Sequence, residues 1–377
     1  MCLFPHQGIL LPWHWIGQNM ILFNDNLISI RAQRGIARYF GEIVAGAGRL
    51  LGDDAVVCSP EPWRYGSARH VRTLRFKGSW RIGLQDKLAS AAARALRPAV
   101  IFNGYYGDVW SGALQAYTVY DMLHELTAPP GHPFIAQKRR CLYRAAALFP
   151  ISYHSANDLI RFYPDLDRAK IHPIPLGVDA SFFVAADEHP AAAGRPYFLY
   201  VGHRTPYKNF MRLLEAFGQA GLARDFDLRV ISPVGTFTDV ELACMTRHGM
   251  TDSVSLIVSP SDEVLRQAYA GAYAFVYPSV YEGFGLPILE ALASRTLVCT
   301  SNVSSMPELG GAAALYFAPE AVESIGACLL RVAAMSAAER RSRIATGVER
   351  ARFFTWERCV TQTIAVLRDL AARGGGA

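Results

Sequence analysis

The sequence predicts an α/β protein made of two doubly wound domains, each a parallel sheet covered by helices. Three observations support this fold class. The 377 residues are enough for two domains of ordinary size. Hydrophobic residues make up 51% of the chain and charged residues 19%, so the chain can bury large cores and intrinsic disorder is excluded. Short apolar runs also alternate with segments of helical periodicity, as in parallel sheets with helical crossovers.

The expected strands are short runs rich in β-branched and aromatic residues, each bounded by turn residues. Most are continuously apolar rather than alternating, which is typical of strands buried on both faces. They cover residues Ile21–Asp25, Ala55–Cys58, Ala99–Phe102, Tyr117–Tyr120, Leu148–Ser152, Tyr197–Val201, Leu228–Ser232, Val254–Val258, Ala272–Tyr277, Leu297–Thr300 and Ala314–Phe317.

The expected helices lie between these strands and show apolar residues at a helical period. They cover residues Ile36–Leu51, Leu84–Leu96, Ile135–Ala147, Phe210–Ala220, Asp262–Ala270, Ile288–Ala293, Val322–Ala334 and, at the end of the chain, Trp356–Ala371.

The predicted domain boundary lies in an Ala-, Pro- and Gly-rich stretch, residues 185–196, because a fresh strand opens directly after it. We therefore expect an N-terminal Rossmann-like domain over residues 20–187 and a C-terminal one over 188–355. A final helix and a flexible tail occupy residues 356–377. Residues 1–19 are apolar but lack a basic leader and are broken by prolines and histidines, so we expect a disordered extension or a mis-called start rather than a signal peptide.

Charge and cysteine content narrow the function classes. The net charge of +6 is too small for this length to indicate nucleic-acid binding. The seven cysteines are odd in number and never spaced as Cys-x-x-Cys, which argues against a disulfide framework and a structural zinc site. No stretch reaches the roughly 18 uninterrupted apolar residues of a membrane-spanning helix. We expect a cytoplasmic protein.

The strongest motif is the string EGFGLPILE, which runs from Glu282 to Glu290 after a predicted buried strand. Gly283 and Gly285 let backbone N–H groups approach a ligand at a helix N-terminus, where phosphate or a sugar oxygen is favoured. Glu282 and Glu290 can each accept hydrogen bonds from a sugar diol. A helix-capping loop with a glutamate stabilised by the helix dipole explains the same spacing equally well.

A second motif, VGHRTPYKN over residues 201–209, also follows a predicted strand directly. Arg204 and Lys208 flank a tight turn before a helix. Two cations at such a place can form a diphosphate clamp, with bidentate contacts from the arginine and a point charge from the lysine. Two solvated loop cations are the alternative interpretation.

Two weaker motifs lie in the first half. Gly35 belongs to the loop Arg31–Tyr39 after the first strand, and a single glycine does not make a dinucleotide-binding fingerprint. His124 follows another predicted strand, with Asp121 and Glu125 as candidate orienting partners. A packing or loop role is the alternative for His124.

Taken together, these motifs resemble glycosyltransferase family 4, retaining enzymes of the GT-B fold that use nucleotide sugars. The resemblance runs from about Met20 to Leu370 and includes the segments RAQRGIARY, YDMLH, PLGVD, YVGHRTPYKN, YPSVYEGFGLPILE and SNVSSMPE in the family's order. The Glu-x7-Glu string with its internal Gly-Phe-Gly-Leu-Pro is the most specific of these. The resemblance implies two Rossmann-like domains that face each other across a cleft, an N-terminal acceptor domain and a C-terminal donor domain, with the final helix packed on the first.

The resemblance also implies roles for the motif residues. Arg204 and Lys208 would hold the donor diphosphate, and Glu290 would bind ribose hydroxyls. Glu282, with the backbone of Gly283, Phe284 and Gly285, would hold the donor sugar. His124 would contact that sugar from the first domain, and Gly35 would let its loop come near the phosphates.

The expected reaction is front-face transfer of a hexose through an oxocarbenium-like transition state, with retained configuration. The two cations and the helix N-terminus offset the charge on the leaving diphosphate, so neither a metal nor another cofactor is expected. A glycosidase would also use two carboxylates but leaves the basic pair without a purpose. A sugar-nucleotide 2-epimerase of the same architecture and a non-catalytic nucleotide-sugar-binding protein remain alternatives.

The expected partners are a nucleotide sugar and a saccharide or lipid-linked acceptor, without nucleic acid. The YKN and YDMLH segments look most like mannosyl-transferring members that act on bacterial surface polysaccharides. Residues 61–97 hold nine basic and two acidic residues interleaved with aromatics, so this segment could lie on an anionic membrane surface. An ordinary solvated face explains it equally well.

Overall fold

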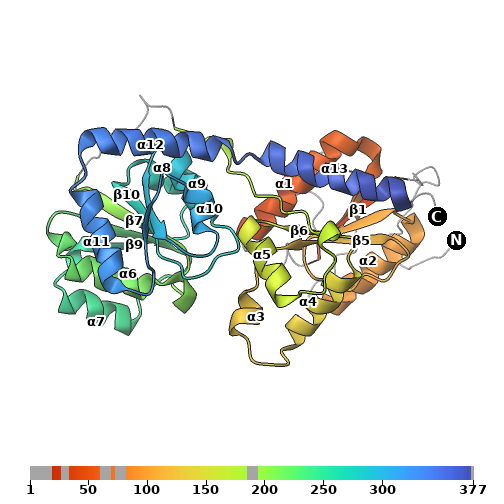
Figure 1. Ribbon diagram of the computed structural model, residues 1–377, viewed down its shortest axis with the longest axis horizontal. Coiled ribbons are helices and arrows are strands. Elements are labelled where there is room, and N and C mark those ends of the chain that lie inside the picture. The colour runs from red at the N-terminus through yellow and green to blue at the C-terminus, as the bar shows by residue number, and fades with distance from the viewer. Residues whose placement is uncertain (1–18, 27–33, 60–68, 73–81, 185–193, 375–377) are drawn as a thin grey trace. The chain divides into compact units, whose positions relative to one another are not determined.

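The computed structural model describes residues 19–26, 34–59, 69–72, 82–184 and 194–374 (Figure 1). The chain forms two compact units. The first unit runs to Ile151 and also contains Ser155–Pro175 and the C-terminal residues from Glu357. The second contains Ser152–His154 and Leu176–Trp356.

The first unit is built on a six-stranded sheet in the order β3-β2-β1-β4-β5-β6, all strands parallel. Its described strands other than β3 are almost wholly buried, which explains their continuous apolar sequences. The strands are β1 (Ile21–Asn24), β2 (Ala55–Ser59), β3 (Arg69–Arg72), β4 (Val100–Asn103), β5 (Leu114–Val119) and β6 (Ala147–Pro150).

The second unit repeats this arrangement with a parallel sheet in the order β12-β11-β10-β7-β8-β9. In both sheets the first strand of the unit pairs with the second and the fourth, so each sheet reverses its winding there, at β1 and β4 in one unit and at β7 and β10 in the other. The strands are β7 (Tyr197–Val201), β8 (Asp227–Ser232), β9 (Val254–Val258), β10 (Ala274–Tyr277), β11 (Leu297–Ser301) and β12 (Leu315–Phe317).

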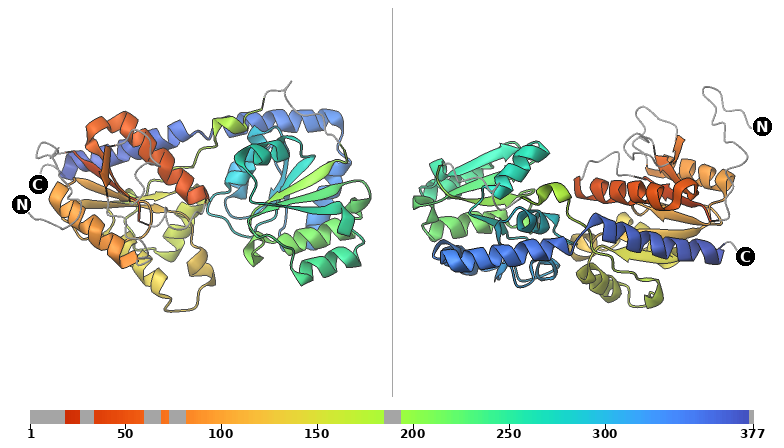
Figure 2. Two further views of the ribbon diagram at one scale, coloured as in Figure 1. Left: turned by 180° about the vertical axis from the view of Figure 1, so that it is seen from behind. Right: turned by 90° about the horizontal axis from the view of Figure 1, so that it is seen from above.

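Helices connect the strands of both units (Figure 2). The first unit contains α1 (Arg34–Leu51), α2 (Ile82–Leu96), α3 (Leu123–Thr127), α4 (Pro133–Arg144), most of α5 (Tyr153–Phe162) and nearly all of α13 (Trp356–Gly374). The second contains α6 (Phe210–Gln219), α7 (Asp239–Arg247), α8 (Asp262–Ala270), α9 (Leu286–Ala293), α10 (Met306–Gly310), α11 (Val322–Ala333) and α12 (Ala337–Arg352).

The last helix, α13, lies against α1 in the first unit (Figures 1 and 2). A Cβ atom added at Gly46 of α1 would come 2.2 Å from Val360 Cγ1, so the two backbones approach closely there. Ile364 and Leu367 are buried, and the Arg368 guanidinium donates to the carbonyl of Leu50.

The fold class predicted from the sequence is confirmed, since both units are parallel α/β layers. Strand β3 was not predicted because its sequence, RHVR, is basic rather than apolar. The helix expected over 135–147 ends at Arg144, because the chain must already extend into β6 at Ala147. Helices α3, α5, α7, α10 and α12 were also not predicted.

The second unit begins at Leu176, earlier than the boundary predicted at 187. Leu176, Val178 and Phe182 are buried, and Val178 pairs with Thr355, so residues 176–184 pack on the second unit. The predicted extension over residues 1–19 lies almost wholly outside the described residues.

The six described cysteines are buried and free. Among the residues that the structure describes, no helix is both long and apolar enough to cross a membrane.

Candidate active site

The second sheet offers a ligand site where its winding reverses, between β7 and β10. In open α/β sheets, ligands bind beyond the carboxyl ends of the strands at this switch point. Strand β10 pairs with β7, with Ala274 opposite Phe198. The loops that follow them are therefore neighbours, and they carry the motifs VGHRTPYKN and EGFGLPILE.

Lys208 and Glu282 join these two loops. Lys208 Nζ donates to Glu282 Oε1 at 2.6 Å and to the Tyr277 hydroxyl at 3.2 Å. Only 14% of the lysine side chain and 12% of the glutamate side chain are exposed. Burial alone would lower the pKa of Lys208, but Tyr277 and Glu282 outweigh it and raise the pKa well above its usual value. Lys208 is thus a permanent cation at the switch point.

Arg204 makes different contacts from Lys208. Its Nε donates to Glu241 Oε1 at 2.9 Å, and each side chain of this pair is only 4% exposed. Its other guanidinium nitrogens donate to the carbonyls of Val234 and Thr236. Arg204 therefore holds the loop between β8 and α7. A role at a diphosphate requires it to exchange these partners.

The loop from Glu282 to Gly285 is held by serine hydroxyls on its backbone. Ser304 Oγ accepts from the N–H of Glu282 at 3.0 Å and donates to its carbonyl at 2.7 Å. Ser305 Oγ, fully buried, lies 3.0 Å from the same carbonyl and also contacts the carbonyl of Phe284. Ser152 Oγ donates to the Gly283 carbonyl at 2.6 Å. These contacts fix the loop that presents Glu282.

Gly285 begins helix α9 in a conformation that suits glycine. Its φ is +121°, and a Cβ there would lie 3.3 Å from Leu309 Cδ1. Phe284 is buried and packs edge-on against Phe354 at 6.2 Å between centroids. The predicted glycine-rich start of a helix is therefore present, with Phe284 as a packing residue rather than an exposed one.

The two glutamates of the motif have separate partners. Glu282 pairs with Lys208, whereas Glu290 accepts from the Tyr269 hydroxyl at 3.0 Å. Burial raises the pKa of Tyr269 well above its usual value, so this hydroxyl stays a donor. Glu290 is half-buried on α9, one turn past its start.

His124 belongs to the first unit and lies in the first turn of α3. Its ring contacts Phe134, with 4.4 Å between centroids. The expectation that Glu125 orients His124 is wrong, because Glu125 binds Lys138 Nζ at 3.0 Å and the Tyr163 hydroxyl at 2.7 Å. The Asp121 carboxylate accepts from the N–H of Leu123 at 3.1 Å, just before α3.

Other predicted residues are only partly described. Gly35 lies exposed in the first turn of α1, but residues 27–33 of its loop are outside the described residues. Residues 61–68 and 73–81 of the basic segment 61–97 also lie outside the described residues.

Three groups of side chains in the described ranges are of the type that binds metal ions. Two are acidic Asp-x-Asp pairs that our expectation of no metal overlooked. Asp165-Leu166-Asp167 lies in the first unit, where Asp167 caps a short 3-10 turn. Asp225-Phe226-Asp227 lies in the second unit, where Asp227 pairs with Arg195 at 3.0 Å. Glu215, Cys244 and His248 form the third group, where Glu215 already binds His248 at 3.0 Å and Arg247 at 2.9 Å. None of these groups is made by the motif residues.

Sequence reasoning missed Tyr277 and the serines that hold the loop. Two signals were available. Tyr277 ends the predicted strand Ala272–Tyr277, and the SNVSSMPE segment with Ser304 and Ser305 follows the next predicted strand, Leu297–Thr300. Ser152 carried no signal, since it lies 131 residues from its partner Gly283.

Residues 184–348 match the family model described as glycosyl transferases group 1. The O-antigen chain mannosyltransferase B of Escherichia coli is 32% identical over 272 residues, covering 66% of this chain and 69% of that protein. The chain belongs to the group 1 glycosyl transferases. This chain is also 28% identical over 244 residues to the MMP alpha-(1->4)-mannosyltransferase of Mycolicibacterium hassiacum. It spans 58% of that protein, less than two thirds of its length.

Solved structures agree on the fold of this glycosyltransferase. WaaG, a glycosyltransferase involved in lipopolysaccharide biosynthesis, superposes with a TM-score of 0.68 at 14% identity over 92% of this chain and 99% of that chain. Anabaena HepE, in complex with UDP and glucose, gives a TM-score of 0.70 at 15% identity over 93% and 99%. These similarities show the GT-B fold and its two parallel α/β domains.

Proposed function

We propose that this glycosyltransferase moves a hexose, with mannose from GDP-mannose favoured, to a saccharide or lipid-linked acceptor in surface polysaccharide synthesis, with retained configuration and without a metal. The relatives support the sugar. Besides the two mannosyltransferases above, the O-antigen chain mannosyltransferase RfbU of Salmonella typhimurium is 28% identical over 177 residues, 47% of this chain and 48% of that protein.

The pairing of Lys208 with Glu282 carries this proposal. A nucleotide sugar consists of a diphosphate and a polyhydroxylated ring joined at one bond. A buried ammonium next to a carboxylate, both at the switch point of the donor sheet, matches that pair of groups in chemistry and spacing. Lys208 would contact the diphosphate and Glu282 would accept from sugar hydroxyls, so that the donor replaces their mutual contact.

The proposed chemistry needs positive charge at the leaving group. The bond from the anomeric carbon to the diphosphate oxygen breaks while the acceptor oxygen bonds to the same face of the sugar. The acceptor proton passes to a diphosphate oxygen. Lys208, the N-terminus of α9 and Arg204, after release from Glu241, would stabilise the charge that develops there.

The other motif residues complete this proposal. Glu290 would bind the ribose, and Gly283 and Gly285 would bring backbone N–H groups to the donor sugar. His124 would contact the same sugar from the first domain, and Gly35 would leave space for the phosphates. We place the enzyme in the cytoplasm, peripherally at the inner face of the membrane that carries a lipid-linked acceptor.

A donor screen with product analysis tests the proposal. Binding of GDP-, UDP-, TDP- and ADP-sugars is measured by thermal shift, since a bound donor raises the melting temperature by mass action. We expect the largest shift with GDP-mannose and, with a mannoside acceptor, an α-linked product by NMR that forms equally in EDTA. A free or epimerised sugar as the product would instead identify an epimerase, and binding without any product a non-catalytic protein.

A further inference from the structure

We infer that the buried ion pair of Lys138 and Glu125 positions His124 for its contact with the donor sugar. The pair acts through the backbone of α3 rather than by a bond to the imidazole. The inference rests on the proposed function, because that function gives His124 this contact. It also accounts for a charge that the proposed mechanism does not use. The Lys138 side chain is only 1% exposed, although lysine is almost never fully buried unless its charge is paired.

Helix α3, which carries His124, has no buried apolar residue of its own. It is only five residues long, and helices shorter than about 12 residues do not persist without tertiary contacts. Neither of its leucines is buried, and Leu126 is 46% exposed. The position of His124 therefore depends on the contacts that neighbouring elements make with α3.

Lys138, from helix α4, holds α3 on both sides of His124. Its Nζ donates to the carbonyl of Asp121 at 2.6 Å and to Glu125 Oε2 at 3.0 Å, and it lies 3.2 Å from Met122 Sδ. An ammonium group has three N–H donors, so these three partners use them all. Two of the partners precede His124 in the chain and the third follows it directly. A movement of His124 away from α4 would stretch at least one of these contacts.

Glu125 is held from a second direction as well. Its Oε1 accepts from the hydroxyl of Tyr163, the residue after α5, at 2.7 Å. Burial lowers the pKa of Lys138, and Glu125 and Asp121 offset part of this effect. Burial and Glu125 raise the pKa of Tyr163, so its hydroxyl stays a donor. Because buried ion pairs often add little net stability and in some proteins select one geometry, the place of this pair beside His124 favours a positioning role.

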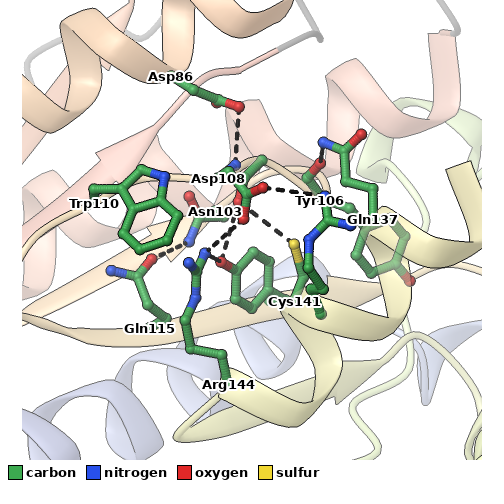
Figure 3. Close-up of polar contacts among 12 residues, drawn as sticks. Asp86, Asn103, Tyr106, Asp108, Trp110, Gln115, Gln137, Cys141 and Arg144 are labelled. Atoms are coloured by element: carbon green, nitrogen blue, oxygen red, sulfur yellow. Dashed lines mark hydrogen bonds and ion pairs between the residues drawn. The ribbon is translucent and has the colours of Figure 1, made fainter. Parts of the chain in front are cut away.

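Helix α4 is itself fixed on the sheet of the first unit. The side chain of Gln137, next to Lys138 in the chain, donates to the carbonyl of Tyr106 at 2.7 Å (Figure 3). At the end of the helix, Arg144 donates to the Tyr117 hydroxyl at 2.8 Å (Figure 3). The Lys138 ammonium also lies 5.3 Å from the centre of the Tyr106 ring, within the range of cation–π attraction. These contacts join α4 to β5 and to the segment after β4, so Lys138 extends from a fixed base.

The same side of α4 also holds the His124 ring. Phe134 and Lys138 are four residues apart on α4, so their side chains lie on one side of the helix. Phe134 contacts the imidazole, with 4.4 Å between the ring centroids, while Lys138 holds the backbone around it. One helix thus fixes both the backbone and the ring of His124, as a preorganised site requires.

A double-mutant cycle tests the inference. Lys138→Met/Glu125→Gln removes both charges, and kcat for transfer from GDP-mannose to a mannoside is measured with and without His124→Ala, below the melting temperature of every variant. We expect the two changes to lower kcat about tenfold or more in the wild-type background, and to have no further effect once His124 is alanine. Arg139→Met, which removes a charge from an exposed neighbour on α4, should behave like the wild type.

The imidazole NMR signals of His124 give a readout that does not depend on activity. They are assigned by comparison with His124→Ala. We expect them to shift or broaden in Lys138→Met/Glu125→Gln, while the signals of His203 and His248 in the second unit stay unchanged.

Equal losses of kcat in the two backgrounds would overturn the inference, since the buried pair would then support the fold alone. Unchanged kcat and unchanged His124 signals in Lys138→Met/Glu125→Gln would also overturn it. Normal turnover by His124→Ala would refute the contact of His124 with the donor sugar, and the inference with it. A failure of the proposed role of His124 and a failure of the positioning pair are therefore distinguishable.

Discussion

Lys208 and Glu282 lie 74 residues apart in the chain, yet their side chains meet at 2.6 Å where the donor sheet reverses its winding. The contact places a cation and a carboxylate side by side, each with most of its side chain buried. Tyr277 and Glu282 together raise the pKa of Lys208 above its usual value despite its burial. The central feature of the candidate site is therefore a charge pair, which a donor would divide between its phosphate and its sugar under the proposed function.

Replacing Lys208 by alanine should lower kcat about a hundredfold or more, since one positioned charge at the leaving group is lost. Lys208→Arg, which keeps the charge but not the geometry, should recover part of the rate. Steady-state kinetics with a melting curve for each variant makes the comparison. Near-wild-type turnover of Lys208→Ala would remove this residue from the phosphate role.

Arg204→Ala should destabilise the protein by about 3–5 kcal/mol, because it leaves Glu241 buried without its cation. The double variant Arg204→Ala/Glu241→Ala should regain part of that stability. If Arg204 also contacts the diphosphate, the double variant stays inactive after its fold is restored, and urea unfolding beside kinetics separates the two roles. Recovery of activity together with stability would assign Arg204 to the β8–α7 loop alone.

Ser305→Ala should cost about 1–3 kcal/mol, since it removes the hydroxyl that donates to the carbonyl of Phe284, while the Glu282 carbonyl keeps Ser304. We also expect a rise in KM for the donor, because the Phe284 end of the loop is no longer held. Ser304 adopts φ +57°, so Ser304→Gly should be better tolerated than Ser304→Ala although both lose the hydroxyl. Equal stability of those two variants would speak against backbone strain at this position.

Gly177→Ala should destabilise the second unit by about 1–3 kcal/mol. A Cβ at this glycine would come 2.1 Å from the backbone nitrogen of Trp356, so one of the two segments must shift. Gly41→Ala on α1 is the matched control, because nothing lies within 4 Å of its Cβ and alanine favours a helix. A melting temperature for Gly177→Ala as high as that of the control would contradict the close packing.

His172 should contribute to the acid sensitivity of the first unit. Burial lowers the pKa of His172 below its usual value. As the pH falls through about 6.5, the unfolded chain takes up the proton first, so the stability from this histidine is present above that pH and is lost as the pH falls through the folded pKa. His172→Phe should therefore lose less melting temperature than the wild type between about pH 7.5 and about pH 5. An NMR titration of His172 with a normal pKa would refute this.

The sheets were predictable because parallel strands buried on both faces leave an unmistakable apolar sequence. The central strands follow this rule. The edge strands β9 and β12 are apolar in sequence but only partly buried, and the edge strand β3 escapes prediction because it is basic. The boundary at Leu176 was not predictable, since only the folded chain shows that Val178 pairs with Thr355.

The sequence could locate the residues of the candidate site, but it could not show which of their side chains are in contact. Strand-end loops with glycines and cations pointed to Lys208 and Glu282, yet spacing cannot tell which side chains meet. Arg204 illustrates the difference. The pattern of Thr238 and Glu241 signals a helix cap, and it is one, but only the structure shows that the free oxygen of that glutamate also holds the arginine.

The position of α13 has a consequence for biosynthesis. The second unit is nearly continuous in the chain, from Leu176 to Trp356, whereas the first needs a helix that is translated after the whole second unit. On the ribosome, the apolar side of α1 that packs against Val360 stays uncovered until α13 emerges. The first unit therefore starts to be made before the second but can be completed only after it, and the nascent chain exposes an apolar surface in the meantime.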